Sequence, residues 1–298
     1  MDERALLDLI RAELPSAGDD AAVVDGLVVT TDMLHASTDF PAGTTRYTEG
    51  WRAVGASLSD VAAMGAEAVA TVAAYGAPTF DADEVRSFVR GAREVSELAG
   101  ASYVGGDSDA HGEFTVATTA IGRTDDPVYR DGASPGEAVC VTGTLGRTAA
   151  ALRLFEEGDS KRGNGLFRFE PRVDAGRAIA PHATAMMDSS DGLARSLHQV
   201  GEASDCGFAI DGDRLPVDDA VVDVAADAPE ALDLATTVGE DFELVFTVPE
   251  DVLPDARASS PVPVTRVGRV TEGRVELDGE ELADRGYSHH EYTGRQND

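Results

Sequence analysis

Short apolar runs alternate along the chain with stretches in which apolar residues recur every three or four positions. The short runs are rich in β-branched residues, which predicts strands, and they cover residues 21–31, 114–123, 137–143, 185–187, 206–211, 242–248 and 264–270. The periodic stretches predict helices, and they cover residues 49–65, 81–99, 147–157 and 172–180 and a segment that begins near residue 192. This alternation predicts an α/β protein of the α+β type.

The helix over residues 81–99 has the clearest pattern. Val85, Phe88 and Val95 lie on one stripe of this helix, and Gly100 follows as a stop signal. The segment around Lys161, between two predicted helices, is expected to form a loop.

A polar stretch with two prolines, residues 123–137, separates the two halves of the chain. Domain boundaries fall in linkers of this kind, and 298 residues are enough for two domains. We therefore predict an N-terminal domain of residues 1–124 and a C-terminal domain of residues 125–298.

The composition is strongly acidic. The chain has 55 acidic and 24 basic residues, a formal net charge of −31, and Lys161 as its single lysine. Such a surface is typical of proteins that work in concentrated salt, where screening weakens the repulsion between like charges, and it is unsuited to nucleic acid. Most carboxylates are then expected to be solvated, as in residues 81–84, 156–159 and 279–284.

Neither a membrane span nor a secretory signal is expected. No apolar run approaches the roughly 20 residues of a membrane helix, and the initial MDERALLDLIRAEL lacks the apolar region of a signal peptide. Cys140 and Cys206 lie in apolar contexts, which is typical of buried residues in a reducing compartment. We therefore expect a cytoplasmic protein.

Several carboxylates are not explained by a solvated surface. Each lies at the end of an apolar run or inside an apolar element, often beside glycine: Asp19, Asp20, Asp32, Asp60, Asp107, Asp188, Asp191, Glu240 and Asp241. Burying several carboxylates together is tolerable only when cations lie among them. Because these are hard oxygen donors, and no HExxH or CxxC occurs, the pattern predicts magnesium, with manganese as a substitute.

Clustered carboxylates that hold Mg²⁺ commonly serve phosphate chemistry, because the metal lets an acidic pocket hold a polyanion such as ATP. The usual nucleotide motifs are missing from the sequence, because there is no Walker lysine and no GxGxxG. Residues 142–152, TGTLGRTAAAL, have the wrong spacing for a phosphate loop and are better interpreted as a strand-to-helix turn. The sequence thus predicts a phosphate site of another architecture.

The order of several motifs resembles that of the thiamine-monophosphate kinases. These belong to a superfamily with aminoimidazole ribonucleotide synthetase, selenophosphate synthetase and a hydrogenase maturation factor. The motifs are GDDAAVV, TTDML, SLSDVAAMGA, VGGDS, YRDGASPGE, VTGTLGRTAAAL, DSSDG and GEDFELVFTVPE, and the resemblance extends to the closing RGYSHHEY. SDVAAMGA and the aspartates are shared across the superfamily, whereas DSSDG and GEDFEL are more specific to the kinase branch.

The resemblance implies a set of site residues. It assigns magnesium binding to Asp20, Thr30, Thr31, Asp32, Asp60, Asp107, Asp188 and Asp191. It assigns ATP contacts to Gly106, Asp107, Arg130 and Ser190, and contacts with the thiamine phosphate to Glu240 and Tyr287. The chain departs from many relatives at Asp39, where a histidine often contacts the substrate, so no role is assigned to Asp39.

The resemblance also implies a two-domain fold like that of aminoimidazole ribonucleotide synthetase. The N-terminal sheet would pair across a homodimer, with ATP in a cleft near the interface. The implied reaction is the ATP-dependent phosphorylation of thiamine monophosphate to thiamine diphosphate. The acceptor phosphate, with a second pKa of about 6, is already largely ionised at neutral pH. A general base is therefore unnecessary, and magnesium would align an in-line transfer.

Two alternatives stay open. The first is another ATP-using enzyme of the superfamily, acting on formylglycinamidine ribonucleotide or on selenide. A selenide enzyme should carry a reactive cysteine near its N-terminus, and this N-terminal segment has none. The second is a non-enzymatic, salt-adapted scaffold that binds Mg²⁺ incidentally, which predicts that losing a single aspartate leaves ATP binding unchanged.

Overall fold

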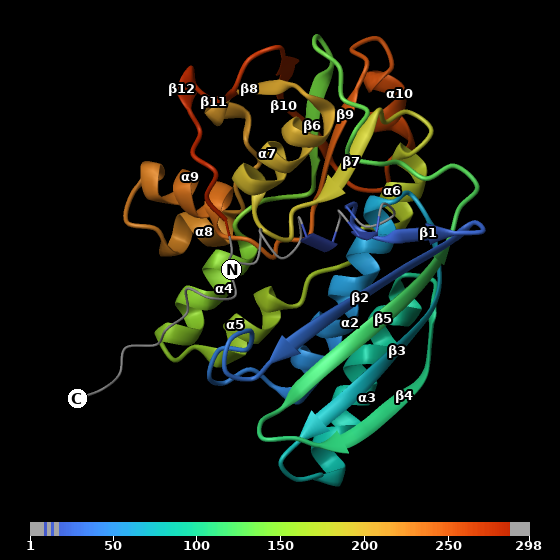
Figure 1. The fold of residues 1–298 in the computed structure, drawn as a ribbon. Coiled ribbons are helices and arrows are strands. Elements are labelled where there is room, and N and C mark those ends of the chain that lie inside the picture. The colour runs from blue at the N-terminus through green and yellow to red at the C-terminus, as the bar shows by residue number, and fades with distance from the viewer. Residues whose placement is uncertain (1–8, 11–12, 15–17, 287–298) are drawn as a thin grey trace.

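The computed structural model describes residues 9–10, 13–14 and 18–286. The chain forms two β-sheets, each packed against helices, and helix α2 (Arg46–Ala63) lies between the two sheets (Figure 1). The first sheet ends at Arg123 and the second begins at Ala138, on either side of the polar stretch. The α/β class with two parts is confirmed, whereas the boundary after residue 124 stays a prediction.

The first sheet has five strands in the order β1-β2-β5-β3-β4. These are β1 (Ala22–Val24), β2 (Leu27–His35), β3 (Glu67–Ala77), β4 (Ser102–Ala110) and β5 (Thr115–Arg123). β3 and β4 pair in parallel, and the other neighbours are antiparallel. Helices α2 and α3 (Ala82–Leu98) cover one face. On β2, Val29 and Met33 alternate with buried residues and are exposed, which leaves apolar side chains on the other face.

The segment predicted as one strand over residues 21–31 is two strands, so that prediction is wrong. Asp25 and Gly26 both have positive φ, 51° and 76°. They form a two-residue turn that pairs Val24 with Leu27. Left-handed conformations at both turn positions match the twist of the flanking strands, and Asp-Gly is a preferred pair for such a turn. The turn starts β2 at Leu27, which fixes the faces of Thr30 and Asp32.

The second sheet has seven strands in the order β12-β11-β8-β10-β6-β9-β7. These are β6 (Ala138–Thr142), β7 (Ala185–Asp188), β8 (Gly207–Ile210), β9 (Leu244–Val248), β10 (Val264–Thr271), β11 (Val275–Leu277) and β12 (Glu280–Glu281). Every residue of β6 and β9 is buried. Burial on both faces explains why these two strands are continuous apolar runs in the sequence, without a polar alternation.

Helices of the second half lie on both faces and at the end of this sheet. They are α4 (Arg147–Glu156), α5 (Ser160–Phe167), α6 (Val173–Ile179), α7 (Leu193–Ser204), α8 (Asp219–Val224), α9 (Ala228–Thr237) and α10 (Leu253–Ser259), with a 3-10 turn, η1 (Gly212–Arg214). The loop predicted around Lys161 is wrong, because Lys161 lies in α5. The Asp159 carboxylate caps this helix by accepting a hydrogen bond from the Arg162 N–H, 3.2 Å away.

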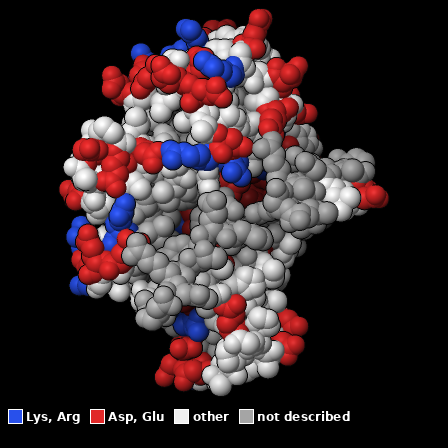
Figure 2. Space-filling model, turned by 60° about the vertical axis from the view of Figure 1, so that its left-hand side comes forward, with Lys and Arg blue, Asp and Glu red and all other residues white. Residues whose placement is uncertain are grey.

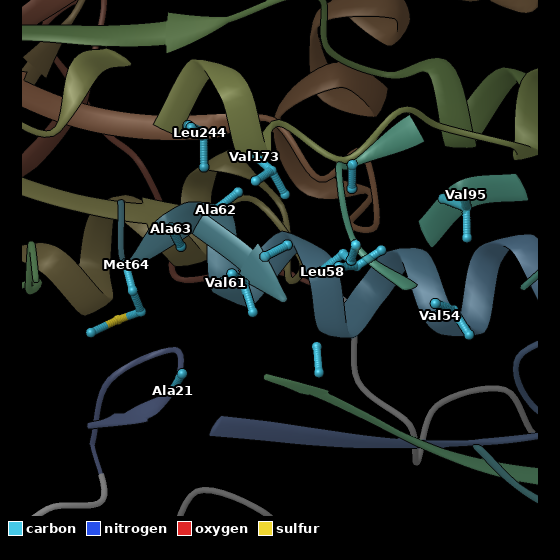
Figure 3. Packing of buried hydrophobic residues seen from close by; sticks show 14 of the residues in the cluster. Ala21, Val54, Leu58, Val61, Ala62, Ala63, Met64, Val95, Val173 and Leu244 are labelled. Atoms are coloured by element: carbon cyan, nitrogen blue, oxygen red, sulfur yellow. The ribbon is translucent and has the colours of Figure 1, made fainter. Parts of the chain in front are cut away.

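Helix α2 supplies much of the core that both halves share. Figure 3 shows Leu58 and Val61 of α2, with the C-cap residue Met64, in one cluster that also contains Val173 and Leu244 from the second half. The small residues of α2 allow its neighbours to approach closely. A Cβ on Gly176 of α6, for example, would overlap the backbone carbonyl of Ala62. This burial holds the end of α2, with its single carboxylate Asp60, against the second sheet.

Candidate active site

Three carboxylates from distant parts of the sequence meet where α2 reaches the second sheet. Asp20 precedes β1, Asp60 lies in the last turn of α2, and Asp188 ends β7. Each offers an oxygen atom, and these three atoms lie within 4.8 Å of one another. We call these residues the carboxylate cluster. Asp20 and Asp60 line a cleft of about 390 Å³, the carboxylate cleft, whereas Asp188 is fully buried beside them.

Hydroxyl and amide groups hold two of these carboxylates in place. The Thr30 hydroxyl donates to Oδ2 of Asp60 at 2.5 Å, and the Ser59 hydroxyl donates to Oδ2 of Asp188 at 2.6 Å. The Ser190 N–H donates to Oδ1 of Asp188 at 3.1 Å. Hydrogen bonds to the charged form partly offset the cost of burying a carboxylate, and they also fix its orientation.

In the absence of cations, the pKa values of the carboxylates in and beside the cluster are raised. Burial raises the pKa of Asp188 to about 7, and the Asp20 carboxylate adds to the shift. Burial, followed by the charges of Asp32 and Asp188, raises the pKa of Asp60 well above its ordinary value. Burial also raises the pKa of Asp19 to about 6, against the opposing effect of Arg130. Neighbouring carboxylates that resist ionisation in this way fit a site for divalent cations.

Arg130 is the counter-ion of the cluster. One Nη of its guanidinium donates to Oδ1 of Asp20 at 2.8 Å, and its Nε lies 3.6 Å from Oδ1 of Asp19. Within the described part of the chain, Oδ2 of Asp20 is buried and has no hydrogen-bond partner. A buried carboxylate oxygen without a donor is costly, and a hard cation between Asp20, Asp60 and Asp188 would satisfy it. The residues present therefore fit magnesium.

Three more of the predicted metal residues lie on β2: Thr30, Thr31 and Asp32. Asp32 points toward α2, where the Ser57 hydroxyl donates to its Oδ2 at 2.5 Å. Thr31 is exposed on the opposite face and donates its hydroxyl to the backbone oxygen of Thr118, although it also borders the carboxylate cleft. Because side chains alternate between the two faces of β2, Thr30 and Asp32 lie on the side of the cluster and the Thr31 side chain points away from it.

Ser190 and Asp191 follow Asp188 in the turn that leads to α7, and both line the carboxylate cleft. Gln199 of α7 donates its side-chain N–H to Oδ2 of Asp191 at 3.3 Å. The cleft thus brings Ser190 and Asp191 together with Arg130.

Gly106 and Asp107 lie apart from the cluster. Asp107 lies inside β4, at the opposite edge of the first sheet from β1. A Cβ on Gly106 would overlap the backbone oxygen of Ala73, so only glycine fits there. Both residues line a second pocket, of about 480 Å³, whose aromatic walls include Tyr75 and Phe88.

The predicted substrate residues have different placements. Glu240 is buried and paired with Arg52 of α2, with Nη and Oε2 2.8 Å apart. Tyr287 lies outside the described residues. Asp39 is also buried, and its Oδ2 accepts hydrogen bonds from the His35 N–H and the Thr38 hydroxyl. In this structure, Asp39 therefore stabilises the turn after β2.

Sequence reasoning missed the role of Ser59. Two residues with hydroxyl groups, Ser57 and Ser59, precede Asp60 in the second half of α2. They hold Asp32 and Asp188 respectively. Their position just before Asp60, in the mostly small and apolar second half of α2, was the available signal.

The chain is similar to proteins of one family over nearly its whole length. Residues 18–124 match the AIR synthase related protein N-terminal domain, and residues 134–279 match the AIR synthase related protein C-terminal domain. The thiamine-monophosphate kinase of Halobacterium salinarum is 60% identical over 291 residues, which cover 97% of this chain and 100% of that protein. The thiamine-monophosphate kinase of Methanospirillum hungatei is 42% identical over 300 residues, with 97% and 100% covered.

A solved structure has the same architecture. The structure of AaThiL complexed with AMPPCP and TMP superposes with a TM-score of 0.88 at 28% sequence identity, and the match covers 97% of each chain. The match therefore includes both sheets.

Proposed function

This chain belongs to the thiamine-monophosphate kinases of the AIR synthase related family, and we propose that it transfers the γ-phosphoryl group of ATP directly to the phosphate of thiamine monophosphate. The main support for this proposal is the carboxylate cluster, in which Oδ2 of Asp20 is buried without a hydrogen-bond partner among the described residues. Two anionic substrates meet in an acidic cleft, which is feasible only with cations between them.

We propose that Asp20, Asp60 and Asp188 hold magnesium, with Asp32, Thr30 and Asp191 beside them. When bound, magnesium neutralises phosphate oxygens and supports an in-line transfer. The carboxylates of the cluster would not also act as a general base, because they would bind the cation. The acceptor phosphate needs none, since its second pKa is about 6.

Arg130 is positioned to steady the phosphates of ATP. Its guanidinium fork suits phosphate oxygens, and in this structure it neutralises Asp20 at the rim of the carboxylate cleft. Binding a cation to Asp20 would replace this partner, which frees the guanidinium for the nucleotide. Ser190 borders the same cleft and is proposed as a second ATP contact. Glu240 and Tyr287 remain our proposed substrate residues.

A homodimer would reunite the separated parts of the site. Gly106 and Asp107 lie on edge strand β4, three strands away from β2, so one chain does not bring them to the carboxylate cluster. The face of the first sheet that α2 and α3 leave uncovered exposes apolar side chains, including Met33. A partner sheet on this face would bury them and carry its own Asp107 pocket toward the cluster. The aromatic walls of that pocket suit the adenine ring.

The direct test is product formation. The protein is incubated with Mg·ATP and thiamine monophosphate in concentrated potassium chloride, and thiamine diphosphate is measured after oxidation to fluorescent thiochrome. We expect product that disappears with EDTA and falls more than about 100-fold in Asp60→Asn, while Asp83→Asn, an exposed acid of α3, behaves as the parent. Folded protein that binds Mg·ATP without making product would overturn the substrate assignment.

Within the described residues, no helix is long and apolar enough to cross a membrane. Figure 2 shows acidic side chains spread over the face in view, with few basic ones, which supports the expectation of work in concentrated salt. The cytoplasmic location stays a prediction.

A further inference from the structure

A pocket of about 320 Å³ opens beside Trp51, at the end of α2 remote from the carboxylate cluster. Three arginines line it: Arg147 at the start of α4, and Arg168 and Arg172 after α5. We call it the arginine pocket. None of its lining residues lines the carboxylate cleft.

Three arginines and three acids line the arginine pocket, but the acids do not pair with all three arginines. Arg172 is neutralised by Glu243, which accepts two hydrogen bonds from its guanidinium, at 2.5 and 2.8 Å. Asp241 is buried and accepts hydrogen bonds from the backbone N–H groups of Gly146 and Thr148 at the start of α4. The last acid of the lining, Glu170, is largely exposed and lies 3.9 Å from Arg172.

Arg147 and Arg168 are thus left without a carboxylate. The Nε of Arg147 donates to the Leu166 backbone oxygen at 3.2 Å, and an Nη of Arg168 donates to the Thr48 hydroxyl at 3.0 Å. Among the described residues, neither guanidinium has an acidic oxygen within 4.0 Å. In a chain with 55 acids and 24 bases, carboxylates for pairing are plentiful.

The comparison with the other arginines makes this pair unusual. The described arginines that form no ion pair are Arg90, Arg123, Arg147, Arg168, Arg257 and Arg269. All but Arg147 and Arg168 are exposed, where water solvates the charge. The two that are half-buried line the same pocket. Partly burying two like charges without counter-ions is unfavourable unless an anion joins them.

We propose that the arginine pocket is a binding site for a phosphate-bearing anion, held by the guanidinium groups of Arg147 and Arg168. A phosphate group carries about −1.5 to −2 charges at neutral pH, which matches two guanidinium groups, and each fork can contact two phosphate oxygens. The pocket volume is at the lower end of the range for small-molecule sites. The phosphate can be free or part of a metabolite, and the test separates the two.

Trp51 gives a direct readout, because it lines the pocket and is the only tryptophan of the chain. The protein is kept in EDTA, where the carboxylate cleft is without cations and repels anions. Inorganic phosphate, pyrophosphate or ATP is then added at constant potassium chloride concentration while the fluorescence of Trp51 is followed. We expect a saturable change. If only ATP causes a response, the ligand is a metabolite that bears the phosphate. If inorganic phosphate also causes one, the phosphate group alone is sufficient for binding.

Variants locate the binding. We expect Arg147→Gln and Arg168→Gln each to weaken binding about tenfold or more, since hydrogen bonds between charged groups are the strong ones. The control is Arg153→Gln, which removes an exposed arginine of α4 that pairs with Glu230; it should bind as the parent does. Thermal melting verifies that each variant is folded. If Arg168→Gln does not fold, the affinity of Arg147→Gln alone tests the proposal. No saturable change in the parent, or equal affinity in all variants, would overturn the proposal.

Discussion

Magnesium binding to the carboxylate cluster should weaken about tenfold between pH 8 and pH 6. The pKa of Asp188 is raised to about 7 by burial and by Asp20. Roughly nine in ten Asp188 side chains are therefore ionised at pH 8, and roughly one in ten at pH 6. Because a carboxylate must lose its proton to bind a metal, the proton competes with Mg²⁺. The raised pKa of Asp60 makes the true decrease larger than this single group implies.

The same shift fixes the sign of the stability change in the metal-free protein. The pKa of Asp188 is higher in the folded chain than its ordinary value of 3.8, so the folded state binds the proton more tightly than the unfolded state does. The stabilisation is fully present below pH 3.8 and is lost as the pH rises through about 7. Magnesium should therefore raise the melting temperature more at pH 8 than at pH 6.

Isothermal titration calorimetry measures both quantities. Mg²⁺ is titrated into metal-free protein at pH 6, 7 and 8, in two buffers of different ionisation enthalpy, which gives the affinity and the number of protons released. Asp188→Asn should lose the affinity and the pH dependence, and Asp83→Asn should keep both. Equal affinity at pH 6 and pH 8 without proton release would refute the assignment of the cluster as the metal site.

Three further predictions concern the scaffold. Arg52→Met leaves Glu240 buried without its partner and should lower the free energy of unfolding by about 3–5 kcal/mol; urea denaturation that finds no loss would show that the pair is already solvated. Met33→Asp on the open face of the first sheet should yield monomers in light scattering, whereas Val222→Asp on α8, also exposed, should not. Gly176→Ala places a methyl group against the α2 backbone and should cost about 1–3 kcal/mol, measured by thermal unfolding.

Much of the fold follows from local patterns in the sequence. The helices at residues 147–157 and 172–180 are confirmed, and they pack mainly on other helices: α4 on α5 and α8, and α6 on α2 and α10. The single strand over residues 21–31 is wrong, although Asp25-Gly26 is itself a hairpin signal. Residues 242–248 were predicted as a strand, yet β9 begins only at Leu244, since Phe242 has a positive φ of 55°. Apolar character alone does not reveal such a local conformation.

The site was predictable in its chemistry and less so in its arrangement. Asp20, Asp60 and Asp188 stood out in the sequence because carboxylates seldom occur in apolar elements, and the fold brings these three together. No local pattern indicates that Asp107 lies at the far edge of the sheet, because strand order is set by tertiary pairing. The pairing of Arg52 with Glu240 is equally a product of the fold, since 188 positions separate them.

Helix α2 has a consequence for folding cooperativity. Two family domains along one chain would ordinarily permit two separate unfolding transitions. Here α2 packs on β2, β3 and β5 of the first sheet and also on β7 and α6 of the second half, and residues of both halves share one core cluster with it. Removing either half would expose the buried surface of α2 to water. We therefore expect one calorimetric transition for the whole chain, and an isolated fragment of residues 1–124 should fail to fold.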